Sequence, residues 1–211
     1  MKTTVLFQGD SITDCGRTTV GGTGLDNKGM GAGYPAMVRA RLMCDHADEE
    51  WTFLNRGISG NRIVDLYARW RIDCINLQPD VLSILIGAND SMHEVINKNG
   101  VDLARSERIY REMLVWVKRE LPKSRLVILE PFTLFQESNE NNDFMAAEIA
   151  ERGVFTKGLA SEFDAVFIPS QSLLNEACKR APKGYWSEDG IHLTPAGHQL
   201  LADAWVSSVK F

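Results

Sequence analysis

The sequence predicts an α/β fold, namely a three-layer α/β/α sandwich around a five-stranded parallel sheet. Short apolar runs alternate with longer amphipathic stretches along the whole of its 211 residues. Several of these runs are almost continuously apolar, as expected of strands that are buried on both faces of a sheet. Repeated strand and helix units in turn imply parallel strands joined by right-handed crossovers, with helices covering both faces.

The expected elements follow the chain in that alternating order. Strands are expected at residues 5–8, 51–55, 81–86, 126–129 and 165–168. Amphipathic helices are expected at residues 35–44, 63–75, 107–121, 144–163, 173–180 and 195–209. The start of the last helix is well marked, because Thr194 is a favourable N-cap and Pro195 is favourable at the first helical position.

Two stretches lie outside this alternation. Residues 16–33 contain seven glycines among Thr, Asp and Asn, at spacings that fit neither phosphate-binding glycine motif. The same stretch lacks the phosphate-cradling pattern of a flavodoxin-like cofactor protein. Residues 133–143 are polar and follow the fourth strand. Both are expected to be loops near the carboxyl ends of the strands, where loops carry function, and the first is interpreted as a long active-site loop.

Length, composition and charge restrict the function further. A chain of 211 residues with 44% apolar residues fits a single domain over residues 1–211. The net charge of -5 argues against a nucleic-acid partner, because phosphate backbones are bound by clustered Lys and Arg. Met1 leads directly into the first strand without a signal-peptide pattern, and no apolar run approaches a membrane span. A cytoplasmic protein with no membrane partner is therefore expected.

The four cysteines predict neither disulfides nor a metal site. Cys15, Cys44, Cys74 and Cys178 are about thirty or more residues apart, without a Cys-x-x-Cys pair or a histidine at zinc-ligand spacing. They are interpreted as reduced, mostly packed thiols, and no metal or cofactor is expected. Cys15 follows Ser11 by four residues and is considered as a competing nucleophile, although nothing near it indicates an activated thiol.

Ser11 is informative because it lies where the first strand should end. It occurs in Gly9-Asp10-Ser11-Ile12-Thr13, directly after the apolar run. Open parallel sheets bind ligands beyond the carboxyl ends of their strands, so a serine at this place faces substrate in an enzyme. Ser and Asp are also good helix N-caps. A catalytic nucleophile and a helix cap therefore both fit this position.

A serine nucleophile needs a base to accept its proton and a third group to orient that base. Of the four histidines, His46 lies in a charged helix end and His198 lies inside the last expected helix. The other two occur as Asp90-Ser91-Met92-His93 and Asp189-Gly190-Ile191-His192. At this spacing a tight turn brings the carboxylate to the imidazole, and spacing alone does not choose between the two segments.

The context of these segments distinguishes them only in part. The second segment lies in a short connection bounded by Gly190 and Pro195, which can hold a catalytic pair on a defined rim. The first segment follows Ile86-Gly87-Ala88-Asn89 at the end of the third strand. Asn89 is either a turn former or a hydrogen-bond donor aimed at a developing negative charge.

Four short blocks of the sequence together resemble a known superfamily. They are Gly9-Asp10-Ser11-Ile12-Thr13, Asn55-Arg56-Gly57-Ile58-Ser59-Gly60-Asn61, Gly87-Ala88-Asn89-Asp90 and Asp189-Gly190-Ile191-His192. In this order and spacing they resemble the SGNH hydrolases, the GDSL-like esterase and lipase superfamily, over nearly the whole chain. The resemblance implies a flavodoxin-like sheet and serine-dependent ester hydrolysis. The Gly-x-Ser-x-Gly elbow of the ordinary α/β-hydrolases does not occur in the sequence.

The resemblance also assigns a role to each matching residue. Ser11 would be the nucleophile, His192 the general base and then acid, and Asp189 the residue that orients it. The oxyanion hole would consist of the backbone N–H groups of Ser11 and Gly60 and the side-chain amide of Asn89. Such donors suit ester cleavage, because an oxygen gains negative charge in the transition state. The other Asp-x-x-His segment would then belong to the rim.

The finer resemblance is to bacterial carbohydrate acetylesterases, notably intracellular acetylxylan esterases. It rests on Gly9-Asp10-Ser11-Ile12-Thr13-Asp14-Cys15-Gly16-Arg17, on the block that ends at Asn61, and on Asp65-Leu66-Tyr67-Ala68-Arg69-Trp70. It implies removal of small acyl groups, acetyl above all, from sugars such as acetylated xylo-oligosaccharides. Trp186, three residues before Asp189, is expected either to face the sugar or acetyl group or to be a packing residue.

Two other functional classes remain open from the sequence. A lysophospholipase or thioesterase would use the same catalytic residues and would need an apolar channel for long acyl chains. A non-catalytic sugar-binding module on the same fold is disfavoured, because every catalytic block is present. The sugar, the acetylated position and the formation of a homo-oligomer are left undetermined by the sequence.

Overall fold

Five parallel strands form the centre of the protein, in the spatial order β2-β1-β3-β4-β5. The computed structural model describes residues 2–18 and 28–211. The strands are β1 (Lys2–Gly9), β2 (Glu50–Asn55), β3 (Val81–Leu85), β4 (Arg125–Leu129) and β5 (Val166–Ile168). Strand β1 pairs with β2 on one side and with β3 on the other. The chain therefore goes from β1 to one edge of the sheet and, after β2, crosses to the other side of β1. Such a switch point is where open α/β sheets bind ligands.

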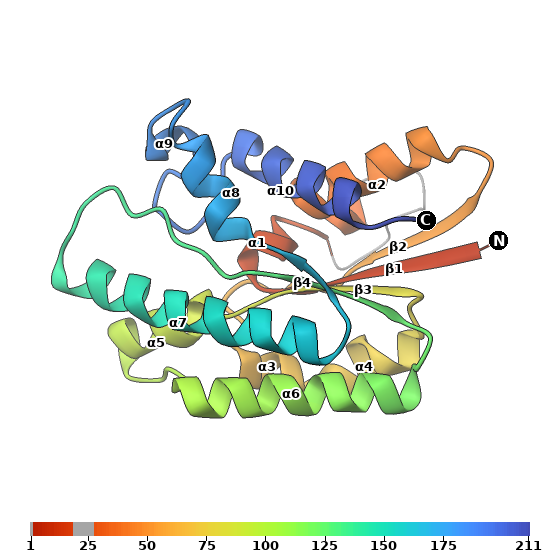
Figure 1. Ribbon diagram of the computed structural model, residues 1–211, viewed down its shortest axis with the longest axis horizontal. Helices are drawn as coiled ribbons and strands as arrows, with labels where there is room; N and C mark the ends of the chain where they lie inside the picture. The colour runs from red at the N-terminus through yellow and green to blue at the C-terminus, as the bar shows by residue number, and fades with distance from the viewer. Residues whose placement is uncertain (1, 19–27) are drawn as a thin grey trace.

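Helices cover both faces of this sheet (Figure 1). One layer contains α2 (Tyr34–Asp45), α8 (Ser170–Ala177), α9 (Lys183–Trp186) and α10 (Pro195–Ser208), with the short α1 (Ser11–Asp14) on the same side. The other layer contains α3 (Ile63–Ala68), α4 (Trp70–Asp73), α5 (Ala88–Asn97), α6 (Leu103–Glu120) and α7 (Glu140–Glu162). Two short 3-10 helices, Lys28–Met30 and Ile75–Leu77, complete the described elements.

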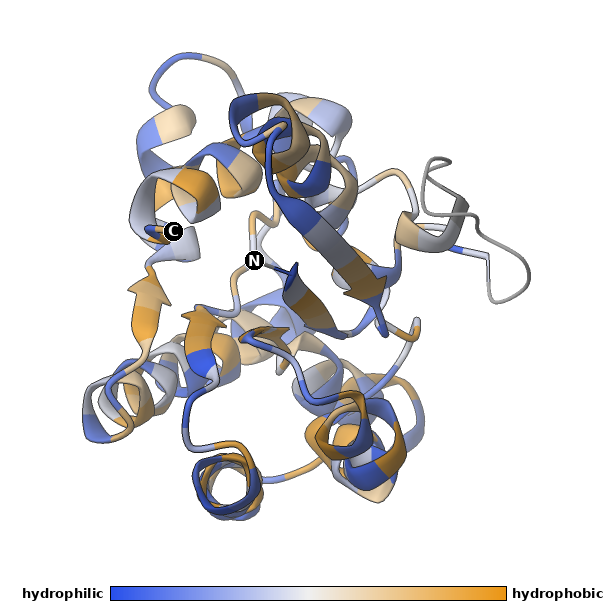
Figure 2. Ribbon diagram, turned by 90° about the vertical axis from the view of Figure 1, so that its right-hand side faces the viewer, coloured by the Kyte–Doolittle hydropathy of each residue, from blue (hydrophilic) through white to orange (hydrophobic). Residues whose placement is uncertain are grey.

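Each face of the sheet has its own hydrophobic core. Val5 and Phe7 of β1 belong to the cluster under α2 and α10, whereas Leu6 between them belongs to the cluster with α3, α4 and α6. This alternation is the period-two pattern of a strand that is buried on both sides. Figure 2 shows the sheet between the two helical layers, with mostly hydrophobic residues in its strands. The predicted three-layer α/β/α sandwich and its five-stranded parallel sheet are confirmed.

The helices differ from the expectation in several places, including the unexpected short α9. The predicted helix over residues 63–75 is divided into α3 and α4, because Arg69 at their junction has a non-helical backbone. The segment after the third strand forms α5, which the sequence did not predict. Helix α7 begins at Glu140 with Asn139 as its N-cap, so the expected polar loop ends earlier than residue 143. The N-cap role of Thr194 is confirmed, since its hydroxyl accepts a hydrogen bond from the Gly197 N–H.

Residues 19–27 of the expected active-site loop lie outside the described residues. In the part that is described, Gly31 packs its Cα against the backbone of Asp14 and Cys15, so this end of the loop adjoins α1. Among the described helices, none is both long enough and apolar enough to cross a membrane.

Candidate active site

The candidate site lies at the carboxyl ends of β1, β2 and β3, which are adjacent in the sheet. The chain beyond β1 carries Ser11, the chain beyond β2 carries Gly60, and the chain beyond β3 carries Asn89. The fold therefore brings three of the four sequence blocks to one edge of the sheet, as expected for parallel strands.

Ser11 is the first residue of α1, and the N-cap is its neighbour Asp10. The Asp10 carboxylate accepts a hydrogen bond of 3.1 Å from the Ile12 N–H. The interpretation of Ser11 as a helix cap is therefore wrong, because Asp10 occupies that position and leaves the serine hydroxyl free for other contacts. Gly9 permits the sharp turn into α1, since a Cβ there would lie 2.3 Å from both the Leu85 carbonyl oxygen and the Thr13 hydroxyl.

A continuous hydrogen-bonded series joins Ser11 to His192 and Asp189. The Ser11 Oγ lies 2.8 Å from His192 Nε2, and His192 Nδ1 lies 2.6 Å from Asp189 Oδ2. The carboxylate fixes the proton on Nδ1, so Nε2 is the acceptor that faces the serine hydroxyl. Both side chains are about half exposed, 50% for His192 and 54% for Asp189. The arrangement can accept the serine proton and hold the resulting imidazolium.

A tight turn preorganises Asp189 beneath the imidazole. Its Oδ1 accepts hydrogen bonds from the backbone N–H groups of Ile191 at 2.9 Å and His192 at 2.7 Å. Although partial burial acts to raise the pKa of Asp189, these bonds and the one from the His192 ring hold the pKa below its usual value. The Ser187 hydroxyl donates to the His192 carbonyl oxygen at 2.8 Å, which fixes the far side of the turn. The carboxylate thus stays ionised and oriented.

The connection between β4 and α7 braces this turn from outside. The Leu134 N–H donates to the Gly190 carbonyl oxygen at 2.7 Å, and the Gln136 side chain donates to the Glu188 carbonyl oxygen at 2.9 Å. Gly190 has a φ of +87°, and a Cβ there would lie 2.5 Å from the Phe135 ring. A glycine is required at this position, because both the backbone conformation and the close packing exclude a side chain.

The other Asp-x-x-His segment forms no such pair. Asp90 is buried in α5, where its carboxylate accepts hydrogen bonds from the Ile63 N–H and the Ser106 hydroxyl. The Nδ1 atom of His93 has no hydrogen-bond partner among the described residues. The structure therefore brings only His192 to Ser11.

The groups assigned to the oxyanion hole lie on two loops that are hydrogen-bonded to each other. Asn89 is 2% exposed, and its side-chain amide donates to the Asn61 carbonyl oxygen at 3.1 Å. Gly60 has a φ of +81°, and a Cβ there would meet no atom within 4 Å. Within the described residues, the N–H groups of Ser11 and Gly60 donate to no other protein group. They are thus available to an oxygen of a bound ligand.

Asp10 is a buried acid that the sequence analysis did not single out. It is 1% exposed, and burial, opposed by the Ile12 N–H and assisted by the charge of Asp90, raises its pKa to about 7. The nearby imidazolium of His192 acts in the opposite direction. Its position beside a serine in a strand-to-helix turn is the only sequence signal that could have identified it.

Cys15 lies against His198 rather than against a ligand site of its own. Its Sγ is 3.5 Å from His198 Nε2, and the Tyr34 N–H donates to His198 Nδ1 at 3.2 Å. Burial raises the pKa of the Cys15 thiol and lowers the pKa of His198 to about 4. A neutral thiol beside a neutral imidazole is a weak nucleophile, so these surroundings favour Ser11 over Cys15.

Of the two interpretations of Trp186, the structure favours the packing residue. Trp186 is only 6% exposed, its indole N–H donates to the Ala181 carbonyl oxygen at 3.2 Å, and the Arg180 guanidinium lies over its ring. Its alternative interpretation as a packing residue fits this position in the core cluster. The adjacent Tyr185 is the exposed aromatic residue, at 57%.

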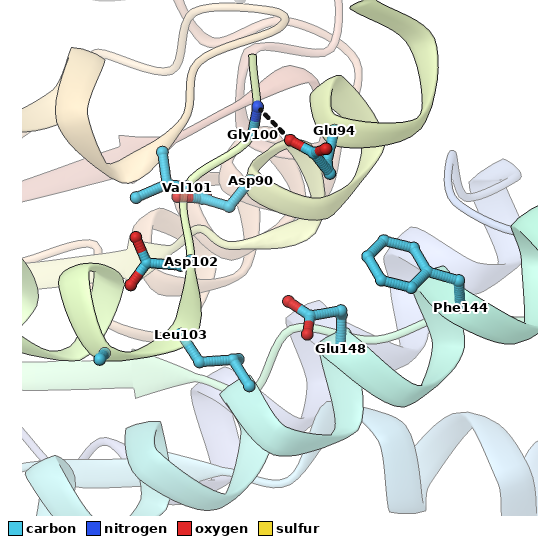
Figure 3. A pocket seen from close by; sticks show the side chains of 9 residues that line it. Asp90, Glu94, Gly100, Val101, Asp102, Leu103, Phe144 and Glu148 are labelled. Carbon is cyan, nitrogen blue, oxygen red and sulfur yellow. Dashed lines mark hydrogen bonds between the residues drawn. The ribbon is translucent and has the colours of Figure 1, made fainter. Parts of the chain in front are cut away.

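One pocket borders the Asp189–His192 pair, and another lies in the helical layer that contains α5, α6 and α7. A pocket of about 270 Å³ borders the Asp189–His192 pair and is lined also by Glu188, Leu193, Thr194 and Pro195. A pocket of about 530 Å³ lies between α5, the start of α6, and α7, with Asp90, Glu94, Phe144 and Glu148 around it (Figure 3). The second pocket includes none of the residues assigned to catalysis.

No metal site is found in the described part of the chain. Within residues 2–18 and 28–211, no group of three or more His, Cys, Asp or Glu side chains could hold a metal ion.

Comparisons with known proteins agree with the geometry. The sequence model of the GDSL-like Lipase/Acylhydrolase family matches residues 7–200. An acetylxylan esterase from Geobacillus stearothermophilus is 34% identical over 211 residues, which cover 98% of this chain and 94% of that protein.

Two crystal structures are similar over almost their whole length. A GDSL-like lipase from Parabacteroides merdae has a TM-score of 0.91 at 38% identity, covering 98% of this chain and 94% of that one. The acetylxylan esterase Axe2 from Geobacillus stearothermophilus has a TM-score of 0.89 at 31% identity, covering 99% and 94%.

Proposed function

Because the chain belongs to the GDSL-like lipase/acylhydrolase family and is a serine ester hydrolase, we propose that it removes acetyl groups from carbohydrates through an acyl-enzyme on Ser11. The observation that carries this proposal is the series of 2.8 Å and 2.6 Å contacts from Ser11 through His192 to Asp189. The same three residue types in this order of contacts serve acyl transfer on unrelated folds.

In the acylation step, His192 Nε2 accepts the hydroxyl proton while Ser11 Oγ attacks the ester carbonyl carbon. The Asp189 carboxylate stabilises the imidazolium that forms. The tetrahedral intermediate then collapses, the bond to the sugar oxygen breaks, and His192 returns its proton to that oxygen. The deacetylated sugar leaves, and the acetyl group remains on Ser11.

In the deacylation step, water takes the place of the sugar. His192 accepts a proton from the water while the water oxygen attacks the acetyl carbon. It then returns the proton to Ser11 Oγ as acetate leaves. The His192 side chain is half exposed, which gives water access to it. Both steps create a negative oxygen, which the N–H groups of Ser11 and Gly60 and the Asn89 amide would stabilise.

The choice of an acetylated sugar rests on the relatives. One relative is an acetylxylan esterase, and Axe2 is described in another crystal structure as an acetyl-xylooligosaccharide esterase. A cytoplasmic location and self-association stay predictions from the sequence.

The substrate class is tested with purified protein on acetylated xylo-oligosaccharides, with acetate release and the loss of each acetyl signal followed by NMR. Release of acetate by the wild-type protein and none by Ser11→Ala is expected. A parallel series of 4-nitrophenyl esters measures the acyl-chain preference, and the acetate is expected to be cleaved much faster than the octanoate. Faster cleavage of the octanoate, with no release from the sugars, would instead support a lysophospholipase or thioesterase.

A further inference from the structure

Arg69 connects the segments that carry the proposed oxyanion donors. Its guanidinium donates to Asn61 Oδ1 at 2.9 Å, to Gln8 Oε1 at 3.1 Å and to the Gly9 carbonyl oxygen at 3.5 Å. It also forms an ion pair of 3.1 Å with Asp73. The Arg69 side chain is only 15% exposed. A planar group with five donors is suited to hold several acceptors at fixed angles.

The partners of Arg69 lie next to the donors themselves. Gly9 precedes Ser11 by two residues at the end of β1, and Asn61 directly follows Gly60 in the loop after β2. Arg69 therefore adds a side-chain connection between these two loops to the direct one, in which the Ile58 N–H donates to the Gly9 carbonyl oxygen at 3.1 Å. Two neighbouring guanidinium groups make other contacts: Arg17 donates to the Gly57 carbonyl oxygen and Arg62 donates to the Asn99 carbonyl oxygen.

The third donor is connected to the same group through Asn61. The Asn61 side chain accepts from Arg69, and its backbone carbonyl oxygen accepts one of the two amide hydrogens of Asn89. That contact orients Asn89 and leaves its second amide hydrogen for a ligand oxygen. A displacement of Asn61 would consequently misplace both Gly60 and Asn89.

We propose that Arg69 is a positioning residue for the oxyanion hole, which it holds together by joining the end of β1 to the Gly60–Asn61 loop. This inference rests on the proposed function, since it requires that Ser11, Gly60 and Asn89 stabilise the transition state. Arg69 touches no reacting atom. Its effect should appear in the stabilisation of the tetrahedral intermediate and little in the binding of the ester.

The first test compares Arg69→Met with Arg71→Met, using 4-nitrophenyl acetate. Methionine keeps much of the side-chain length and removes every donor. Arg71 is the matched control, because it lies two residues after Arg69, in helix α4, and is exposed. Arg69→Met is expected to lower kcat by about 10- to 100-fold with KM changed by less than about 3-fold, a smaller loss than deletion of a donor itself. Arg71→Met should retain wild-type kcat.

Phenylboronic acid gives a readout that a merely structural role would not change. It forms a tetrahedral adduct with a catalytic serine and places a boron-bound oxygen in the oxyanion hole. Its inhibition constant should rise in Arg69→Met by about the same factor as kcat/KM falls, as for a transition-state analogue. An inhibition constant equal to that of the wild-type enzyme would overturn the proposal.

A double-mutant cycle with Asn89→Ala tests the route through Asn61. In the Asn89→Ala background, Arg69→Met should lower kcat by less than it does in the wild-type background, because one of the donors that it positions is already absent. Equal factors in both backgrounds would contradict coupling between the two side chains.

The remaining outcomes are also decisive. If Arg69→Met does not fold, Arg69→Lys replaces it in the test. A lysine can keep the ion pair with Asp73 but lacks the planar set of donors. The kcat of Arg69→Lys is therefore expected to fall by about 5-fold or more. Full activity of a folded Arg69 variant would overturn the inference and leave the proposed function intact. A wild-type protein without esterase activity would instead overturn the proposed function.

Discussion

The two Asp-x-x-His segments of this chain have the same spacing and opposite outcomes. The segment 90–93 lies in helix α5, and the segment 189–192 begins three residues after the last residue of α9, Trp186. In the segment 189–192, the carboxylate and the imidazole are 2.6 Å apart and face Ser11. In the segment 90–93, the carboxylate points into the protein toward Ile63 and Ser106. Identical spacing therefore carries no information about function until the backbone conformation is known.

The backbone explains the difference. Asp90 and His93 lie in α5, where each side chain is directed by the helix and Asp90 falls on its buried side. Asp189 instead opens a turn with Gly190 in the left-handed region, so its carboxylate bonds the N–H groups two and three residues later and meets the ring of His192. Asx turns of this kind fold a carboxylate back over its own chain.

The largest effect should separate the two histidines. His192→Ala removes the proposed base and is expected to lower kcat by about 10⁴-fold or more. His93→Ala should leave kcat within about 2-fold of the wild type, because it contacts no group of the proposed mechanism. Initial rates on 4-nitrophenyl acetate check both variants. A large loss in His93→Ala with an active His192→Ala would reverse the assignment of the two segments.

The two aspartates should differ next most strongly. Asp189→Asn leaves the turn geometry nearly intact but no longer fixes the proton on Nδ1, so kcat should fall by about 10²- to 10⁴-fold while the melting temperature changes little. Asp90→Asn should retain kcat within about 10-fold and shift the melting temperature instead, since its contacts are internal. Paired kinetics and thermal unfolding distinguish these patterns, and equal kcat losses would contradict them.

A smaller effect is expected from the turn itself. Gly190→Ala places a Cβ 2.5 Å from Phe135 at a φ of +87°, which should displace Asp189 and lower the free energy of unfolding by about 1–3 kcal/mol. Its kcat should fall by roughly 10-fold. Gly158→Ala in α7 is the matched control, because a Cβ there meets nothing within 4 Å. That variant should gain about 0.5–1 kcal/mol of stability and keep its kcat.

The smallest effect on catalysis is expected from the titration of Asp90, which changes the pH dependence of stability instead. Burial, opposed by the charge of Arg152, raises the pKa of Asp90 from 3.8 to about 6. The folded state then binds the Asp90 proton more tightly than the unfolded state, so this group makes the protein less stable as pH rises from about 4 to about 6. Asp189, whose pKa is lowered, acts in the opposite direction: its contribution is present above pH 3.8 and is lost as pH falls.

Asp90→Asn removes the first of these two contributions. Its free energy of unfolding, relative to the wild type, should therefore increase between pH 4 and pH 7 by up to about 3 kcal/mol. Urea unfolding of both proteins at the two pH values measures this change. Parallel pH profiles would mean that Asp90 titrates normally in the folded protein.

The fold could be predicted because each strand contains an apolar run, and burial on both faces is most complete in β3 and β4. All five expected runs correspond to strands. Helix α5 was missed because its first turn, Ala88 to Ser91, is buried and contains the polar residues Asn89 and Asp90, which are typical of turns. Likewise, the division between α3 and α4 has no glycine or proline to mark it.

The candidate site was predictable only where chemistry restricts the residue type. A nucleophile and a base have few alternatives, which restricted the histidine to His93 or His192, and the resemblance to the SGNH hydrolases then selected His192 and assigned Asn89 to the oxyanion hole. Arg69 and Asp10 were not identified, because arginine and aspartate also occur throughout solvated surfaces, and only burial reveals their roles. The two interpretations of Trp186 stayed open for the same reason, since nearness to Asp189 in sequence does not indicate exposure.

The parallel direction of the strands has a practical consequence for immobilisation. Every strand ends at the edge that carries Ser11 and begins at the opposite edge, where Lys2 and Phe211 line a common hollow. Figure 1 shows both chain ends on that side. The eight residues of β1 span about 26 Å at ~3.3 Å per residue. A resin or electrode coupled to either terminus would therefore hold the protein with its site directed away from the support, open to polymeric substrates.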